Sequence, residues 1–246
     1  MNLREMRMSA ANKMGNCIFT ILVLILFNLS IISIADASDK VIIDPQYGGK
    51  QFGPIVSSGI RAKDIVLSIA QKLGKKIKEQ TNYETVYTRE SDNYVSLQDR
   101  VLIANKNNGN VLISIGLNSS ENKRANGLEM FIFNVSDGSK DLPLDKNFNS
   151  ETNVVIKDLL STEKNIKSIK LAAAIHAELI AEKIGIRDRG IKSAPFYLLV
   201  GADMPSLMVM VGFLTNEQDE KVLKDPIYQD KIAEALFKGL LKYLRE

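Results

Sequence analysis

Few side chains in this sequence could support acid–base, nucleophilic or metal chemistry. His176 is the single histidine and Cys17 the single cysteine among 246 residues. A zinc site needs three or four Cys, His or carboxylate ligands, and a serine nucleophile needs a histidine base oriented by an acid. His176 lies on a predicted helix beside Leu171, Ile175 and Leu179, where a half-buried histidine without a ligand role is the simpler interpretation. No second histidine is available to complete either kind of site.

Other polar candidates lie near the ends of predicted elements. They are the carboxylates Asp44, Asp64 and Asp203 and the hydroxyls Ser114, Ser119 and Ser206. The carboxylates could form a site for a metal ion other than zinc, but roles as turn caps and in ion pairs explain them more simply. A serine nucleophile would need His176 to face it, and nothing in the sequence predicts that. The sequence also has no P-loop and no dinucleotide-binding fingerprint.

Alternating strands and amphipathic helices must position these residues. Residues 111–117 are apolar at nearly every position, which is typical of a strand buried on both faces. We therefore predict an α/β fold of three layers, with a mixed, mostly parallel twisted sheet of about six strands and helices on both faces. The predicted strands are residues 41–43, 85–88, 111–117, 128–133, 196–200 and 207–214, and the predicted helices are 62–80, 96–105, one that ends at Gly185, one after Asn216 and one after Asp225.

Residues 134–168 form a polar insert in this pattern. They are rich in Gly, Ser, Asp, Asn and Lys, with an apolar group at 154–160 that predicts a short helix. One interpretation is a long surface loop with a turn or two of helix packed on the core. The other is a regulatory insert.

The first 37 residues predict an exported protein. Basic residues precede an apolar run from Cys17 to Ile34, and Ala35-Asp36-Ala37 has the small-x-small pattern of a signal-peptidase site. The alternative is an uncleaved membrane anchor, because the run approaches the length that spans a bilayer. Residues 38–246 would then form one domain. The formal net charge of +3 gives no reason to expect nucleic-acid binding.

One stretch, VIIDPQYGGK at residues 41–50, carries a family resemblance. A short buried strand ends there at Asp44-Pro45, and Gly48-Gly49 follow, so backbone can approach a ligand closely. The stretch resembles the DPGHGG motif of the zinc-dependent N-acetylmuramoyl-L-alanine amidases, which are cell-wall hydrolases. Further blocks resemble the family in the same order, among them SLQDRVLIAN, SIGLNS, GLEMFIF, DRGIKSAPFY and MPSLMVMVGFLTN. The resemblance implies an amidase/phosphorylase-hydrolase-like fold and, in some members, an inserted helix near residues 134–168 that blocks the cleft until a partner removes it.

The resemblance also locates four functional positions, and all four differ here. The family's zinc ligands, two His and one Glu, fall on Tyr47, Gly116 and Ala62, and its general base, a Glu, falls on Met210. Ala62 and Gly116 have no donor atom, and a thioether neither suits zinc nor accepts a proton at neutral pH. We therefore expect no catalytic residue and no cofactor, with zinc only if the family site has been rebuilt elsewhere.

A cleft without its metal could still bind. Tyr47, Arg61, Asn118 and Arg189 offer an aromatic ring, an amide and two guanidinium groups for sugar rings and peptide carboxylates, although packing, turn caps and ion pairs explain each of them equally well. The sequence favours an exported amidase-like pseudoenzyme of the periplasm or cell envelope that binds peptidoglycan or a wall partner. The alternatives are an active amidase with an atypical site and a regulator of an active wall hydrolase.

Overall fold

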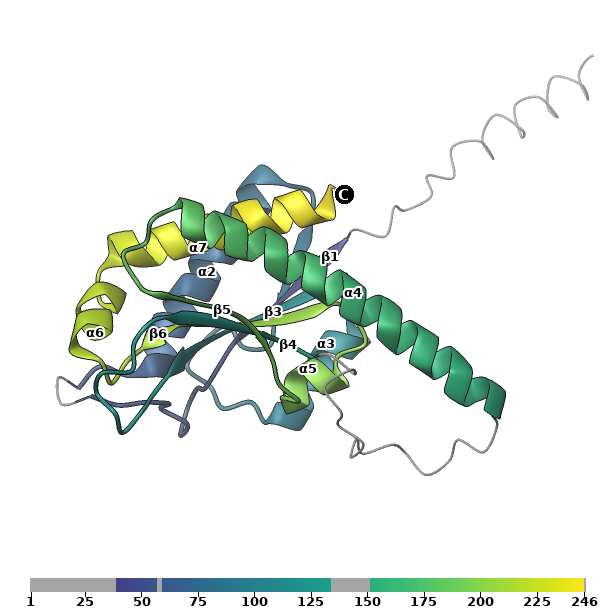
Figure 1. Ribbon diagram of the computed structural model, residues 1–246, viewed down its shortest axis with the longest axis horizontal. Helices are drawn as coiled ribbons and strands as arrows, with labels where there is room; N and C mark the ends of the chain where they lie inside the picture. Colours follow the sequence, from purple (N-terminus) through teal and green to yellow (C-terminus); the bar gives the residue numbers. More distant parts are fainter. Residues whose placement is uncertain (1–38, 57–58, 134–150, 246) are drawn as a thin grey trace, which may run out of the picture. The chain divides into compact units, whose positions relative to one another are not determined.

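The structure, a computed structural model, describes residues 39–56, 59–133 and 151–245, and for residues 151–161 it describes the backbone alone (Figure 1). Asp39–Glu246 forms one compact unit. The predicted signal peptide and the first half of the predicted insert, residues 134–150, lie outside the described residues. In chain order the elements are β1 (Lys40–Pro45), α2 (Ala62–Gln80), β2 (Glu84–Tyr87), α3 (Leu97–Lys106), β3 (Val111–Asn118), β4 (Leu128–Ile132), α4 (Glu151–Ala181), β5 (Asp188–Ser193), α5 (Tyr197–Gly201), β6 (Ser206–Phe213), α6 (Glu217–Leu223) and α7 (Pro226–Leu244).

The strands form one six-stranded sheet in the order β2-β1-β3-β6-β4-β5. The first four of these strands are parallel, while β4 runs antiparallel to β6 and pairs in parallel with β5. This confirms the predicted mixed, mostly parallel sheet. The carboxyl ends of β1, β3 and β6 meet at one edge, which is where ligands bind in open α/β sheets.

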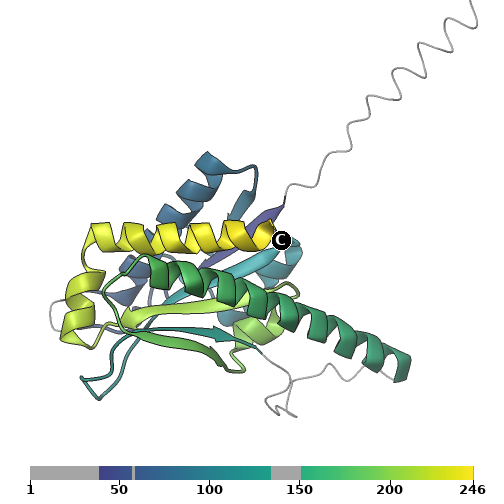
Figure 2. The same cartoon turned by 45° about the horizontal axis from the view of Figure 1, so that its top comes forward.

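Helices cover both faces of the sheet, so the predicted three layers are confirmed (Figures 1 and 2). On one face α2, α4 and α7 pack on side chains such as Ile43, Ile113 and Val209, and these residues are fully buried. On the other face the shorter helices α3 and α5 cover Ile42 and Leu112. The strands β3 and β6, whose carboxyl ends form the site edge, are therefore buried on both faces.

The starts of α3, α6 and α7 were predicted from their caps. The Ser96 hydroxyl accepts a hydrogen bond from the Asp99 amide at the start of α3. The Asn216 side chain caps α6, and Asp225 with Pro226 begins α7. The N-cap of α2, Arg61, makes no side-chain cap, and Asp64 in the first turn complements the helix dipole instead.

Three sequence predictions differ from the structure. The predicted strand at 196–200 is wrong, because Tyr197–Gly201 is the helix α5. The sixth strand is β5, Asp188–Ser193, a polar edge strand that we did not predict. The long-loop interpretation of the insert is wrong for residues 151–168, which belong to the 31-residue helix α4.

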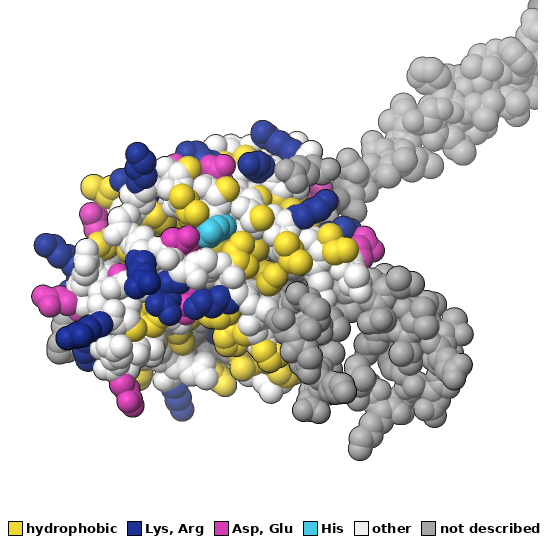
Figure 3. All heavy atoms as spheres, viewed as in Figure 1, with side chains coloured by type: hydrophobic (Ala, Val, Ile, Leu, Met, Phe, Trp, Pro, Cys, Tyr) yellow, Lys and Arg dark blue, Asp and Glu magenta, His cyan; other side chains and the backbone are white. Residues whose placement is uncertain are grey.

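The outer face of the described part of α4 is unusually apolar. Ile166, Ile169 and Ile180 are 51%, 44% and 53% exposed, and Ile191 on β5 is 37% exposed. Figure 3 shows hydrophobic side chains gathered on this face, with basic side chains beside them. None of the helices within the described ranges is long and apolar enough to cross a membrane.

Candidate functional site

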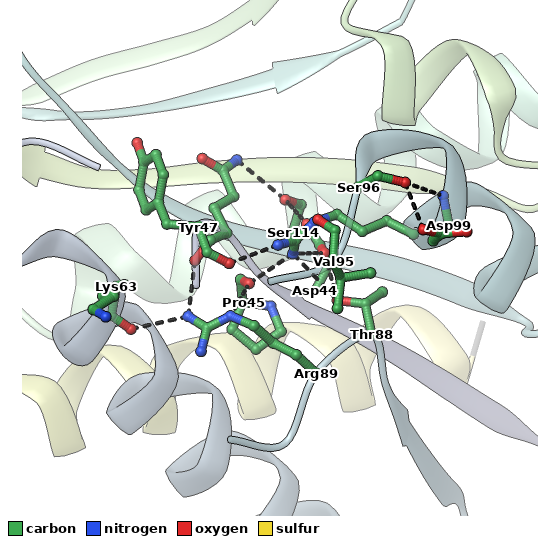
Figure 4. Close-up of polar contacts among 12 residues, drawn as sticks. Asp44, Pro45, Tyr47, Lys63, Thr88, Arg89, Val95, Ser96, Asp99 and Ser114 are labelled. Atoms are coloured by element: carbon green, nitrogen blue, oxygen red, sulfur yellow. Dashed lines mark hydrogen bonds and ion pairs between the residues drawn. The ribbon is translucent and has the colours of Figure 1, made fainter. Parts of the chain in front are cut away.

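The loop after β1 is held by two buried arginines through its backbone. The Arg89 guanidinium donates to the carbonyl oxygens of Pro45 (2.9 Å) and Gln46 (2.8 Å), and Arg100 donates to those of Pro45 (2.8 Å) and Tyr47 (2.6 Å) (Figure 4). Both arginines are 3% exposed. Three successive carbonyls therefore have charged donors, which fixes the loop without using any of its side chains.

Below this loop lies a buried polar network around Asp44. Its carboxylate accepts hydrogen bonds from the hydroxyls of Thr88 and Ser114, both at 2.6 Å, and pairs with Arg100 at 2.7 Å. Asp44 and Ser114 are fully buried. The network links β1, α3, β3 and Thr88, the residue that follows β2, and it accounts for Asp44 and Ser114 as structural residues.

Tyr47, at the first zinc-ligand position implied by the resemblance, is turned toward β3. It has a left-handed backbone with φ of 63°, and its hydroxyl donates to the Leu117 carbonyl at 2.7 Å. Burial raises the pKa of the Tyr47 phenol to about 12, even though the hydrogen bond to Leu117 lowers it. At neutral pH the phenol is protonated and donates its proton in the hydrogen bond to the Leu117 carbonyl, so it is a poor ligand for a metal ion.

The second position, Ala62, lies close to the Tyr47 ring. A Cβ built at Gly53 would lie 2.8 Å from the Ala62 methyl carbon and 2.8 Å from two carbons of the Tyr47 ring. Ala62 itself is fully buried at the start of α2. The Ala62 methyl group and the Tyr47 ring thus both lie against Gly53, and a methyl group provides no ligand atom at this corner.

Gly116 and Met210 are register partners on β3 and β6, and one side chain reaches both. That side chain is Gln46. Its amide nitrogen donates to the Ser114 hydroxyl at 3.1 Å and lies 3.9 Å from the Met210 sulfur. A Cβ built at Gly116 would lie only 2.2 Å from the Gln46 Oε1 atom. The Gln46 side chain therefore occupies the space at position 116.

The structure brings the four positions together at the carboxyl ends of β1, β3 and β6, but their side chains do not fit zinc. Tyr47 supplies a hydrogen-bonded phenol, Ala62 a methyl group and Met210 a thioether, and Gly116 has no side chain. Zn²⁺ requires imidazole, thiolate or carboxylate ligands. Among the side chains that the structure describes, those of residues 39–56, 59–133 and 162–245, no three His, Cys, Asp or Glu are grouped so as to hold a metal ion. His176 instead pairs with Asp188 at 2.9 Å.

Glu129 on β4 is the strand partner of Met210. It is 6% exposed, and its two oxygens accept hydrogen bonds from Asn118 (2.6 Å), Arg189 (2.8 Å) and Lys192. Burial raises the pKa of the Glu129 carboxyl, but the hydrogen bonds and charges of Lys192 and Arg189 outweigh it, so the pKa is lowered. A carboxylate held in this way is a weak base.

The four predicted binding residues are therefore placed in three different settings. Asn118 and Arg189 meet at Glu129, and Tyr47 faces Leu117. Arg61 lies exposed over the Phe52 ring, 5.3 Å from its centre. Our sequence analysis missed Gln46 and Glu129, although DPQYGG differs from DPGHGG at position 46 as well as at 47.

An open groove runs outside the same edge of the sheet. It is lined by the loops that follow β1, β3 and β6, including Ile55, Lys123, Arg124 and Thr215, and by Lys221 on α6. The side chains of Lys123, Arg124 and Lys221 form no ion pair with any residue in the described part of the chain, whereas Lys224 in the same groove pairs with Glu220 at 2.7 Å. The groove therefore offers three cationic groups to a ligand.

Comparisons with known proteins agree with this architecture. The model of the N-acetylmuramoyl-L-alanine amidase family matches residues 41–242. The amidase LytC of Bacillus subtilis is 30% identical over 207 residues, which is 84% of this chain but 36% of LytC. This chain thus spans about a third of that relative.

Solved amidases have the same fold. The crystal structure of an amidase from Clostridium difficile 630 aligns with a TM-score of 0.70 at 30% identity, covering 86% of this chain and 99% of that one. The CwlD amidase from Clostridioides difficile, solved in complex with the GerS lipoprotein, aligns with a TM-score of 0.68 at 27% identity, covering 85% and 99% of the two chains.

Proposed function

Because this chain belongs to the N-acetylmuramoyl-L-alanine amidase family, we propose that it is an exported member that binds peptidoglycan or a cell-wall partner without hydrolysing it. The observation that carries the proposal is the pocket at Tyr47, Ala62, Gly116 and Met210, where an intact scaffold presents no metal-ligand set. Function has to be argued from the site, because one fold hosts many activities.

Hydrolysis of an amide by this family's chemistry needs a metal-bound water and a base. The metal lowers the pKa of its bound water to about 7, and a carboxylate takes up the proton. Here Met210 is 8% exposed and offers a thioether, and Glu129 beside it is already paired with two cations. Neither group supports proton abstraction from water.

Binding does not need these groups. The groove outside β1, β3 and β6 presents Lys123, Arg124 and Lys221, which are suited to the carboxylates of wall peptides. Its shape is open, as a polymer ligand requires. We infer that wall material binds along this groove.

The test combines a hydrolysis assay with a binding assay on the same purified protein. We expect no release of peptide from muropeptides, with or without added zinc, and sedimentation of the protein with purified cell-wall sacculi. Lys123→Ser combined with Arg124→Ser should weaken sedimentation several-fold. Lys170→Ser combined with Lys167→Ser, which removes two positive charges from α4, should leave it unchanged.

Two outcomes would contradict the proposal. Peptide release that a chelator abolishes would support the alternative, an active amidase with an atypical site, which family membership also favours. Absence of sacculus binding together with capture of a wall hydrolase from the same cell would support the regulator alternative. CwlD in complex with the GerS lipoprotein shows that a related chain can have a protein partner.

A further inference from the structure

We propose that the Gln46 side chain fills the pocket at the four positions where the family's zinc ligands and general base fall. It thereby excludes a metal ion and takes up the space that the ion and its ligand would fill. The inference rests on the proposed loss of hydrolysis and explains how the pocket stays ordered without an ion. It assigns a role to a residue outside the four positions at which the family's functional side chains fall.

The first observation is the space that Gln46 takes. A Cβ built at Gly116 would lie 2.2 Å from Oε1, 2.5 Å from Cδ and 2.8 Å from Nε2 of Gln46. All three distances are shorter than a van der Waals contact, so the whole carboxamide group lies where a side chain at position 116 would begin. A histidine at 116 and Gln46 in this conformation exclude each other.

The second observation is that the two sequence changes are complementary. The resembled motif DPGHGG has glycine at the position of Gln46, and the second zinc-binding histidine of the resembled family falls on Gly116. One change adds a side chain to the pocket and the other removes one, so the filled volume is kept. Cores tolerate such volume-conserving exchanges far better than either change alone.

The third observation is that Gln46 is fixed at both its backbone and its side chain. The backbone amide of Gln46 donates to the Ile115 carbonyl at 3.0 Å, and the backbone carbonyl of Gln46 accepts from Arg89 at 2.8 Å. At the side chain, Nε2 donates to the Ser114 hydroxyl at 3.1 Å, and Ser114 is itself held by Asp44 at 2.6 Å. The carboxamide is therefore the end of a hydrogen-bonded chain that begins in the core.

Nε2 of Gln46 is directed to Ser114 and Met210, and Oε1 lies where a side chain at position 116 would begin. A cation bound at position 116 would first have to displace the carboxamide and break its hydrogen bond to the Ser114 hydroxyl. The cost is of the order of one hydrogen bond, which corresponds to about a tenfold loss of metal affinity.

The experiment restores the ligands with and without Gln46. One variant of the exported chain carries Tyr47→His, Ala62→Glu and Gly116→His, and a second adds Gln46→Gly. As a matched control, a third adds Lys50→Gly instead, which introduces a glycine at an exposed position of the same loop. Zinc affinity is measured by competition with a chromogenic chelator, and folding is checked by circular dichroism.

We expect the variant with Gln46→Gly to bind one zinc ion at least about tenfold more tightly than the other two. Equal affinity in all three variants would overturn the proposal, and so would the absence of zinc binding in all three, since Gln46 would then not be what excludes the ion. None of these results depends on hydrolysis by the unchanged protein, so failure of the proposed function is recognised separately by its own assay.

A second measurement covers the case in which the ligand variants do not fold. Gly116→Ala should lower the melting temperature by about 2 °C or more when Gln46 is present, because the new methyl group displaces the carboxamide. In the Gln46→Gly background the same change should cost less than half as much. Equal costs in the two backgrounds would show that the side chains do not compete for space.

Discussion

Replacing Arg100 with methionine should destabilise the protein more than any surface substitution. The Arg100 and Asp44 side chains are 3% and 1% exposed and pair at 2.7 Å. Methionine keeps much of the apolar volume but leaves the Asp44 carboxylate with only the hydroxyls of Thr88 and Ser114. Breaking a buried pair by removing one partner costs about 3 to 5 kcal/mol of the free energy of unfolding.

The loop after β1 adds to this cost. Arg100 donates to the Tyr47 carbonyl at 2.6 Å and to the Val95 carbonyl at 3.1 Å. The Pro45 carbonyl keeps the hydrogen bond from Arg89 at 2.9 Å, so its loss is partial. We therefore expect about 4 kcal/mol in total, since the pair and its carbonyl contacts are not independent.

Urea unfolding followed by circular dichroism measures the effect, with Arg187→Met as the control. Arg187 is exposed, and its substitution should change the free energy of unfolding by no more than about 0.5 kcal/mol. A loss below about 1 kcal/mol for Arg100→Met would refute the reasoning that the pair and its carbonyl contacts hold the site loop. A variant combining Asp44→Asn with Arg100→Met should recover part of the loss, because it no longer buries an unpaired charge.

Three further predictions concern the pocket itself. Because the pKa of Glu129 is lowered in the folded state, its ionised form stabilises the fold above the ordinary pKa of a glutamate, and this stabilisation is lost as the pH falls through the lowered value. The stability difference between the unchanged protein and Glu129→Gln should therefore shrink between pH 7 and pH 3 in thermal melts. A constant difference would contradict this. Tyr47→Phe removes the hydrogen bond to the Leu117 carbonyl and should cost about 1 kcal/mol in urea unfolding, whereas Tyr83→Phe, at a tyrosine away from the pocket, should cost less. Met210→Glu places a carboxylate at a position that is 8% exposed and should destabilise by about 1 to 3 kcal/mol without producing muropeptide cleavage; cleavage by this single variant would show that a metal is already bound.

The parts of the fold that were predictable from sequence are those with strong local signals. Mostly apolar strands such as Val111–Asn118 and capped helices such as α3 were predicted within a few residues of their observed bounds. The strand β5 was missed because an edge strand does not need apolar alternation, and its sequence DRGIKS has none. The run at 196–200 was assigned the wrong type, because five apolar residues fit a strand and a buried helical turn equally well.

The helix α4 was only partly predicted because, at residues 165–169, polar side chains are buried and apolar side chains are exposed, the reverse of the usual pattern. Asn165 and Ser168 are 5% and 1% exposed, whereas Ile166 and Ile169 face outward. Ser168 can be buried because its hydroxyl donates to the Lys164 carbonyl and accepts from the Ser206 amide. Polar burial of this kind depends on tertiary partners that a periodicity argument does not contain.

At the site, the sequence predicted which positions meet but not what fills the space between them. Comparing motifs one position at a time shows that Gly116 has lost its side chain. It does not show that Gln46, 70 residues earlier in the chain, has taken its place, because only the pairing of β1 with β3 brings the two together. The role of Glu129 was hidden for the same reason, since Asn118 lies on β3 and Arg189 and Lys192 lie on β5, far from Glu129 in the sequence.

The arginine contacts to the loop after β1 explain why such exchanges are possible. Arg89 and Arg100 bind carbonyl oxygens of residues 45–47, and every amino acid has one of these. The support is thus indifferent to which side chains the loop displays. Residues in a loop whose backbone is held in this way can be substituted, in evolution or by protein engineering, and each new side chain will extend from the same backbone position.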